Sequence, residues 1–413
     1  MNEHLKLEFG IRLASRAGAK KMRILATAAS LLLPVMAAGG AAAQDVLKIG
    51  LLPSATGAGA ANGAAMTAGV ELAVSELNKQ GGVLGRQIEI IRGDTQSNPT
   101  TAAGEARRLI DREGVQILIG PAISQEAVPA VEVATSGKIV QVTNAGTTAL
   151  TPKVGPYHFS FNTNIASAAK MIVDTIGEMQ FKTVGLLADD GGQSRSGVAA
   201  VKELAAAAGI QIVGEQEYHF RADDLSPQIL SLKGAKPEAV IFFTSSVEDG
   251  AKMLKTLGDV GWQPKIFGAT SMSVFAPAIV RSTGPEAYAN VYAVAYRGMT
   301  YCEGDVEGES DYAKFTEALA AFKPESAGKI SNSLASEYYD AVKLLAAGVT
   351  ALGSTDGPAL AEWVETKGSE VPLIHGAISP SSESHFLFGT DELAVVERPH
   401  ELRSDGLMKR RGC

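Results

Sequence analysis

The sequence predicts an α/β protein made of two lobes, each a doubly wound parallel sheet. Short, continuously apolar segments alternate along the chain with amphipathic segments of helical period. This alternation is typical of parallel strands buried between two layers of helices. The pattern runs once over 46–143 and starts again over 166–268. A length of 413 residues also suits two domains.

The first run opens with an apolar strand at 46–52, followed by a helix at 64–78. Val70, Val74 and Leu77 fall on one face of that helix, and Gly81-Gly82 ends it. The remaining elements continue the alternation to the end of the run. Strands are predicted at 88–91, 115–119 and 139–143, and helices at 100–112 and 124–136.

The second run repeats the alternation, and the last third of the chain departs from it. The second run has strands at 184–188, 210–215, 239–244 and 265–268, and helices at 166–179, 197–208, 225–233 and 248–258. A strand at 291–295 and helices at 311–322, 334–351 and 359–366 follow. Short strand-like segments are predicted at 377–378, 386–388 and 393–397, before a loose polar tail at 403–413.

The first 43 residues have the organisation of a secretory signal peptide. A basic cluster at 20–23 precedes an apolar run at 24–38, and Ala41-Ala42-Ala43 supplies the small residues of a cleavage site. The run is shorter than the ~20 residues that a membrane-spanning helix needs. We therefore expect an upstream extension at 1–21, a signal core at 22–43 and a soluble periplasmic protein.

Charge and motifs exclude several classes of function. Subtracting the +4 of the first 43 residues from the total of −8 leaves −12 on the mature chain, which does not favour nucleic-acid binding. Gly57 and Gly59 lack the third glycine of a dinucleotide fingerprint, because position 62 is Asn62. No catalytic triad or paired-carboxylate site stands out, so we predict no enzyme activity and no cofactor.

Histidines and cysteines give no metal site in the sequence. No two histidines have metal-ligand spacing, and His375 and His385 are interpreted as solvated loop residues. The two cysteines are Cys302 and Cys413. They could form a disulfide in an oxidising compartment. Because Cys413 ends the polar tail, we favour free thiols or an intermolecular contact. The pair Asp189-Asp190 is interpreted as a loop and helix-capping feature.

Small hydroxyl and glycine-rich segments follow four of the predicted strands. They are centred on Thr56, Ser124, Thr147 and Gln193-Ser194. Ligands of open parallel sheets bind outside the carboxyl ends of the strands, and helix N-termini there bind anions. The alternative is that Ser124 and Thr147 only cap helices. The repetition at successive strand ends favours a binding site for a carboxylate.

Several segments resemble the leucine/isoleucine/valine-binding protein family, the type I periplasmic solute-binding proteins of ABC transporters. They are Val-Leu-Lys-Ile-Gly-Leu-Leu-Pro at 46–53, Gly-Gly-Val-Leu-Gly-Arg at 81–86 and Asp-Thr-Gln-Ser-Asn-Pro at 94–99. The resemblance extends over 45–400. It implies two lobes joined by three crossovers, with lobe 1 at 45–160 and 293–372 and lobe 2 at 161–292 and 373–413.

The resemblance also implies site residues. It places the carboxylate-binding roles of the family on Ser124, Ala145 and Thr147, with Thr56 as a weaker candidate. The second lobe would contribute Gln193, Ser194, Ser246 and Thr270. Members that bind α-amino acids often carry an acidic residue where this chain has Thr270. An unpaired buried ammonium is costly, so we expect an aromatic or other organic acid without an α-ammonium.

The expected function is therefore capture of a small solute for a membrane ABC permease, by a monomer without metal or cofactor. Two alternatives remain within the same fold. One is a branched-chain or other amino-acid or amide binding protein of the same family, and the other is a sensory ligand-binding protein. An exported enzyme would need a nucleophile–base pair or a metal cluster, and the sequence has neither.

Overall fold

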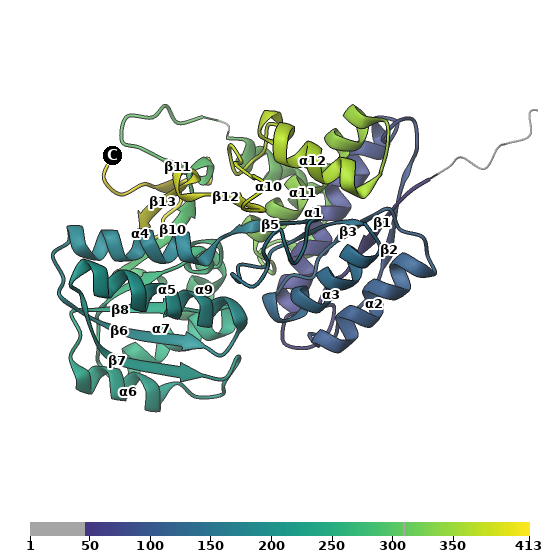
Figure 1. Ribbon diagram of the computed structural model, residues 1–413. Coiled ribbons are helices and arrows are strands. Elements are labelled where there is room, and N and C mark those ends of the chain that lie inside the picture. Colours follow the sequence, from purple (N-terminus) through teal and green to yellow (C-terminus); the bar gives the residue numbers. More distant parts are fainter. Residues whose placement is uncertain (1–45, 309) are drawn as a thin grey trace, which may run out of the picture. The chain divides into compact units, whose positions relative to one another are not determined.

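The computed structural model describes residues 46–308 and 310–413 and confirms the α/β class with two parallel-sheet lobes (Figure 1). Both sheets belong to a single compact unit. The signal-peptide prediction for 1–43 lies outside the described residues. Within the described ranges, no helix is long and apolar enough to cross a membrane.

The first sheet has six parallel strands in the order β12-β5-β4-β3-β1-β2. Its strands are β1 (Leu47–Leu51), β2 (Ile88–Arg92), β3 (Ile117–Ile119), β4 (Val140–Thr143), β5 (His158–Thr163) and β12 (Phe386–Phe388). The helices between them are α1 (Ala60–Lys79), α2 (Pro99–Asp111) and α3 (Ser124–Ser136). Strands β3, β4 and β5 are buried along their whole length. The residues of β3 are all apolar, whereas β4 and β5 also bury the polar residues Gln141, His158 and Asn162.

The second sheet has the order β13-β10-β9-β8-β6-β7, with β13 antiparallel to β10 and the other pairs parallel. Its strands are β6 (Thr183–Asp189), β7 (Gln211–Tyr218), β8 (Ala239–Phe243), β9 (Lys265–Gly268), β10 (Val291–Tyr296) and β13 (Leu393–Glu397). The accompanying helices are α4 (Ile165–Glu178), α5 (Gly192–Ala208), α6 (Ser226–Ala235), α7 (Val247–Asp259), α8 (Thr270–Val274) and α9 (Ala276–Thr283).

The C-terminal third adds three helices, α10 (Asp311–Phe322), α11 (Asn332–Leu352) and α12 (Gly357–Lys367). Helix α11 packs on α1 of the first lobe. A side chain at Gly69 of α1 would collide with the Ala335 carbonyl oxygen, so glycine allows the two helices to approach closely. Short 3₁₀ segments lie at Pro285–Tyr288, Arg297–Met299, Pro324–Ser326, Gly368–Glu370 and Thr390–Glu392.

The chain passes between the sheets after β5, after β10 and between β12 and β13. Strand pairing differs from the expected lobe boundaries at these three places. The expected boundaries assign β12 to the second lobe and cut through β5 and β10. In the structure β12 pairs with β5, where the Ser160 amide donates to the His385 carbonyl at 2.9 Å. A three-residue strand carries no sequence signal for which sheet it joins.

The C-terminal segment is not the loose tail that the sequence predicts. Strand β14 (Met408–Lys409) pairs with β11 (Thr300–Tyr301), and a disulfide joins Cys302 to Cys413. The Arg403 guanidinium also lies 4.1 Å from the centre of the Tyr301 ring. The expectation of free thiols or an intermolecular contact is therefore wrong. A separation of 111 residues gives no sequence sign that these cysteines meet.

His375 and His385 are buried rather than solvated. His375 Nδ1 lies 2.8 Å from Asp340 Oδ2, and His385 Nε2 lies 2.8 Å from Glu365 Oε1. No metal-binding group of His, Cys, Asp or Glu occurs in the described part of the chain. Because each of the two histidines contacts a carboxylate within the fold, the interpretation of them as solvated loop residues is wrong.

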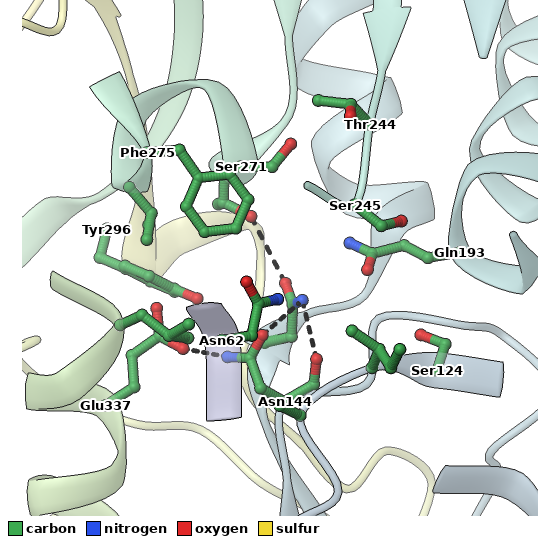
Figure 2. Close-up of a pocket in the computed structure, with 16 residues that line it drawn as sticks. Asn62, Ser124, Asn144, Gln193, Thr244, Ser245, Ser271, Phe275, Tyr296 and Glu337 are labelled. Atoms are coloured by element: carbon green, nitrogen blue, oxygen red, sulfur yellow. Dashed lines mark hydrogen bonds between the residues drawn. The ribbon is translucent and has the colours of Figure 1, made fainter. Parts of the chain in front are cut away.

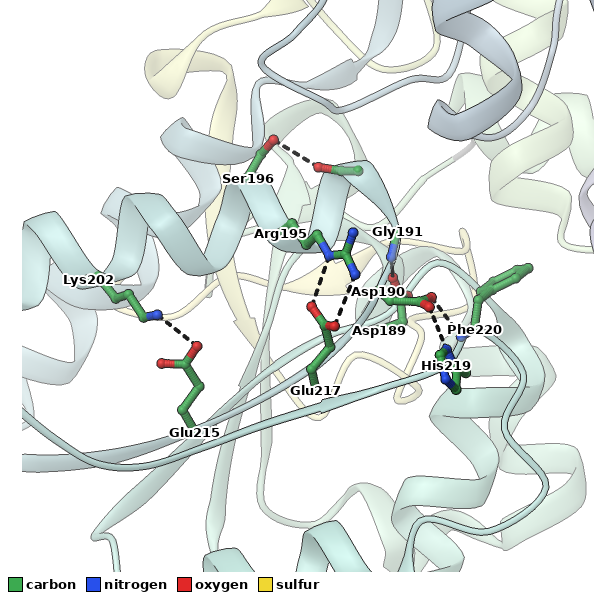
Figure 3. Close-up of polar contacts among 11 residues, drawn as sticks. Asp189, Asp190, Gly191, Arg195, Ser196, Lys202, Glu215, Glu217, His219 and Phe220 are labelled. Carbon is green, nitrogen blue, oxygen red and sulfur yellow. Dashed lines mark hydrogen bonds and ion pairs between the residues drawn. The ribbon is translucent and has the colours of Figure 1, made fainter. Parts of the chain in front are cut away.

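Strand β7 is an edge of the second sheet, and charged side chains cover it (Figure 3). Glu217 binds Arg195 of α5 through two contacts of 2.9 and 3.0 Å, and Lys202 lies 2.7 Å from Glu215. Exposed ion pairs of this kind contribute about 0–1 kcal/mol each. Charged side chains on an edge strand also disfavour pairing with a strand of another molecule.

Candidate ligand-binding site

A cavity lies at the carboxyl ends of strands from both sheets (Figure 2). Most of its lining residues follow β3, β4, β6, β8 and β9, which is where open parallel sheets bind ligands. The lining comprises four amides (Asn62, Asn144, Asn162, Gln193), five hydroxyl residues (Ser124, Thr244, Ser245, Thr270, Ser271), Tyr296, Glu337, and apolar side chains (Ala122, Ile123, Val274, Phe275, Leu334).

The charge of the cavity is unusual for a site that would hold an acid. Among the described residues that line it, none is Lys, Arg or His, and Glu337 is the one carboxyl group. An anion bound here would be held by neutral donors and by helix N-termini, not by a cation. The cavity is therefore suited to a small solute with no more than one negative charge in contact with those donors.

Ser124 lines the cavity at the first turn of α3, as the sequence predicts. The residue that precedes the helix is Ile123, and no side chain caps this end. Ser124 is 4% exposed, and its Oγ has no hydrogen-bond partner among the described residues. The capping alternative for Ser124 is therefore wrong. A buried hydroxyl without a partner is costly, and a ligand would satisfy it.

Ala145 and Thr147 do not line the cavity. Both are buried, and Thr147 Oγ1 accepts a hydrogen bond from the Ala149 amide at 3.3 Å. The Gln193 side chain lies against Gly146, because a side chain at Gly146 would meet it. Gln193 therefore occupies the space next to this loop, and the carboxylate role of Ala145 and Thr147 stays a prediction.

Gln193 and Thr270 line the cavity from the second lobe, as expected. Gln193 is the second residue of α5, and Thr270 is the first residue of α8. Thr270 Oγ1 donates to Asn162 Oδ1 of β5 at 3.4 Å. This hydrogen bond crosses the site, because Thr270 follows a strand of the second sheet and Asn162 lies in a strand of the first.

The other three predicted residues have local structural contacts and lie outside the lining. Thr56 donates to Asp94 Oδ2 at 2.8 Å in an exposed turn. Ser194 is hydrogen-bonded to the buried Asp189. Ser246 caps α7 by accepting from the Asp249 amide at 3.1 Å. Hydroxyl residues after a strand look alike in sequence, whether they cap, turn the chain or face a ligand.

Buried carboxyl groups brace the loops that line the cavity from behind. Asp189 accepts from the Gly191 amide at 2.8 Å and from the Ser245 amide at 2.7 Å, and burial raises its pKa. It thereby ties the start of α5 to the loop after β8. Asp190 contacts His219 and the Phe220 amide instead, at 2.7 and 2.9 Å (Figure 3). The loop interpretation of this pair is consistent with both sets of contacts.

Among the lining residues that were not predicted from the sequence, Glu337 is the one with a carboxyl group. It lies on α11, is 1% exposed, and accepts a hydrogen bond from Asn144 Nδ2. Burial raises its pKa far above the usual range, and the nearby Asp340 adds to this, although a hydrogen bond with Tyr296 opposes it. Two acids three residues apart, Glu337 and Asp340, on a helix with many apolar residues are the sequence signal that could have identified it.

Comparison with known proteins gives one family. The profile of the family described as periplasmic binding protein matches residues 46–389. A relative named Leu/Ile/Val-binding protein homolog 8, from Brucella abortus, is 27% identical over 306 residues, which span 71% of this chain and 74% of the relative.

Two solved structures resemble this chain. The first is the substrate-binding protein of a branched-chain amino acid transporter from Streptococcus pneumoniae, in complex with isoleucine. It aligns with a TM-score of 0.72 and 21% identity, covering 88% of this chain and 98% of that one. The second is a solute-binding protein of an ABC transporter from Rhodopseudomonas palustris, in complex with 4-hydroxybenzoate. It aligns with a TM-score of 0.73 and 17% identity, covering 89% and 96%. At these identities the likeness establishes the fold.

Proposed function

The chain belongs to the periplasmic binding protein family, and from that premise we propose that it delivers a small organic acid to a membrane ABC permease. The family is made of solute-binding proteins, not enzymes. In this proposal the protein works in the periplasm as a monomer. It binds the solute in the cavity between the two sheets, with its carboxylate at the N-terminus of α3.

The observation that carries the proposal is the buried hydroxyl of Ser124. It lines the cavity and has no hydrogen-bond partner among the described residues. It also lies in the first turn of α3, a helix of 13 residues whose N-terminus carries a positive partial charge. A carboxylate oxygen placed there would accept from the hydroxyl and gain from the helix dipole.

An organic acid without an α-ammonium fits this cavity better than an α-amino acid does. The chain has Thr270 where family members that bind α-amino acids often carry an acidic residue, and the carboxyl group of the lining belongs to Glu337. Figure 2 shows Glu337 and Ser124 on opposite sides of the cavity, with Asn144 between them. The ammonium of an α-amino acid is attached next to its carboxylate. With that carboxylate on Ser124, the ammonium would have no acidic partner near it.

The wall formed by Phe275, Tyr296 and Leu334 favours an apolar or aromatic body for the solute. Relatives in this fold have been solved with isoleucine and with 4-hydroxybenzoate, so the fold accommodates both chemistries. Branched-chain amino acids and amides therefore remain the alternative class of solute, and the sensory role is an alternative use of the same site.

The mechanism follows from the two-sided lining. Ser124 and Asn144 come from the first sheet, whereas Gln193, Ser245 and Thr270 come from the second. A solute that contacts both sides stabilises the arrangement in which the two lobes are close together. We propose that the permease recognises that closed arrangement.

The test combines identification and titration. Native mass spectrometry of the purified mature protein would identify any co-purified solute. Isothermal titration would then compare benzoate and 4-hydroxybenzoate with leucine and isoleucine at pH 7. We expect binding of at least one aromatic acid and none of either amino acid. Micromolar binding of leucine or isoleucine, with no binding of any organic acid, would contradict the proposed solute class and leave the family assignment intact.

A further inference from the structure

We propose that Glu337 determines the specificity of this site by keeping its proton and hydrogen-bonding a neutral group at the far end of the solute, such as the ring hydroxyl of a hydroxybenzoate. The inference rests on the proposed function, because it takes the carboxylate of the solute to lie at Ser124.

The position of Glu337 is fixed by packing that does not depend on a ligand. It lies on α11, and the close approach of Gly69 to Ala335 holds this part of the helix against α1. Glu337 is 1% exposed, and Asn144 Nδ2 donates to its Oε2. A side chain held at both the backbone and the carboxyl end can discriminate between solutes, because it cannot move away from a poor partner.

The neighbours of Glu337 offer it little compensation for a negative charge. Asn144 Nδ2, a neutral donor, binds Glu337 Oε2. The Tyr296 hydroxyl donates its single proton to the Phe161 carbonyl oxygen at 3.0 Å. A carboxylate buried among neutral groups is costly, so the protonated form is favoured, although the hydrogen bond with Tyr296 lowers the pKa of Glu337 and opposes this.

The charges around Glu337 support the same state. Asp340 lies on the buried face of α11 and accepts from the His375 amide at 3.2 Å and from His375 Nδ1 at 2.8 Å. Its carboxylate disfavours a second negative charge, and burial disfavours it further. Among the described residues of the cavity lining, no Lys, Arg or His offers a counter-charge.

A neutral carboxyl group discriminates between solutes by the hydrogen bonds that each solute can form with it. It accepts from a hydroxyl or amide of the solute at this end of the cavity, and the amides of Asn62 and Asn144 lie beside it (Figure 2). A solute without such a group leaves a buried polar group unsatisfied, which costs about 1–3 kcal/mol. A solute with an ammonium at this end would first have to remove the proton of Glu337.

The experiment compares three solutes of one shape by isothermal titration at pH 7. They are 4-hydroxybenzoate, benzoate and 4-(aminomethyl)benzoate, titrated into the mature protein and into Glu337→Gln and Glu337→Leu. We expect 4-hydroxybenzoate to bind about tenfold or more tightly than benzoate, because loss of one polar contact to a buried group has that effect. Glu337→Gln keeps that affinity within a few fold, whereas Glu337→Leu removes the preference for the hydroxyl. Glu76→Gln, which removes a carboxyl that binds Tyr339 outside the cavity lining, leaves all affinities unchanged.

Tightest binding of 4-(aminomethyl)benzoate, lost in Glu337→Gln, would overturn the inference, because it requires an ionised carboxylate. If none of the three solutes binds, the proposed aromatic class fails, and the protonation state is still decided by infrared spectroscopy. The carbonyl stretch of a protonated carboxylic acid at pH 7 should be present in the protein and absent in Glu337→Gln. Identical spectra for the two proteins would overturn the inference by themselves.

Discussion

Replacement of Ser124 by alanine separates a ligand-binding hydroxyl from a structural one. Most buried hydroxyl groups stabilise the folded protein through their hydrogen bonds, so their removal lowers both stability and function. The Oγ of Ser124 has no partner among the described residues, and α3 has no side-chain cap. Removal of this hydroxyl should therefore weaken solute binding without lowering the stability of the solute-free protein.

The magnitudes follow from the same observation. A hydrogen bond from Ser124 to a carboxylate is worth about 1.5–3 kcal/mol, so Ser124→Ala should weaken solute binding by about 10- to 150-fold. In the free protein the substitution removes a buried, unsatisfied hydroxyl, whose burial costs about 1–3 kcal/mol. The free energy of unfolding without solute should therefore stay the same or rise.

Isothermal titration with the co-purified solute and urea unfolding of the solute-free protein measure the two quantities. Ser310→Ala is the matched control, because Ser310 caps α10 away from the cavity lining. It accepts from the Ala313 amide at 2.9 Å and donates to the Asp405 carbonyl at 2.6 Å. It should lose about 1 kcal/mol of stability and keep its affinity. A Ser124→Ala variant that is less stable but binds normally would refute the reasoning.

Three further predictions concern stability. Replacing both Cys302 and Cys413 by serine should lower the free energy of unfolding, measured in urea, by about 4–5 kcal/mol, because the disulfide closes a loop of 111 residues. A loss below 1 kcal/mol would show that the pairing of β14 with β11 keeps the C-terminal segment in place without the disulfide. Glu337 ionises in the unfolded chain but stays neutral when it is buried in the folded protein. The free energy of unfolding of the native protein, relative to that of Glu337→Gln, should therefore fall as pH rises above 4.5, by up to about 1.4 kcal/mol per pH unit, in urea titrations from pH 5 to 8. A constant difference between the two proteins would mean that the folded protein ionises Glu337 normally. Gly69→Ala should destabilise the protein by about 1–3 kcal/mol and weaken solute binding, because the added methyl group collides with Ala335 and displaces α11 from α1. Thermal unfolding and isothermal titration of the variant would detect the two effects. Normal values for both would contradict the close contact between the helices.

Much of the fold could be predicted from the sequence because its signals are local. Helix α3 occupies the predicted range 124–136. Every strand of the two sheets except β5, which the apolar pattern did not predict, begins and ends within three residues of a predicted segment. What could not be predicted is pairing between distant segments. The three residues of β12 do not specify a neighbour, and only the backbone bonds to β5 place this strand in the first sheet.

The site residues also divide into those that could be predicted from local sequence and those that could not. The family resemblance indicated Thr270, and the position at a strand end indicated Ser124 and Gln193. All three residues line the cavity. The position at a strand end also indicated Thr56, which binds Asp94 instead. A strand end brings a hydroxyl group to the correct edge of a sheet, but the direction of the side chain depends on the neighbours it meets there.

The sequence by itself determined the fold class, the family and the edge of the sheets at which the cavity lies, because periodicity and strand-end motifs are properties of neighbouring residues. Only the tertiary structure decided which hydroxyl groups face the cavity, that Cys302 meets Cys413, and that Glu337 enters the site from the last third of the chain. These features depend on the packing of segments that are far apart in sequence. The protonation state of Glu337 depends on that packing most directly, since its burial and the nearby charge of Asp340 arise only after α11 has packed against the first lobe.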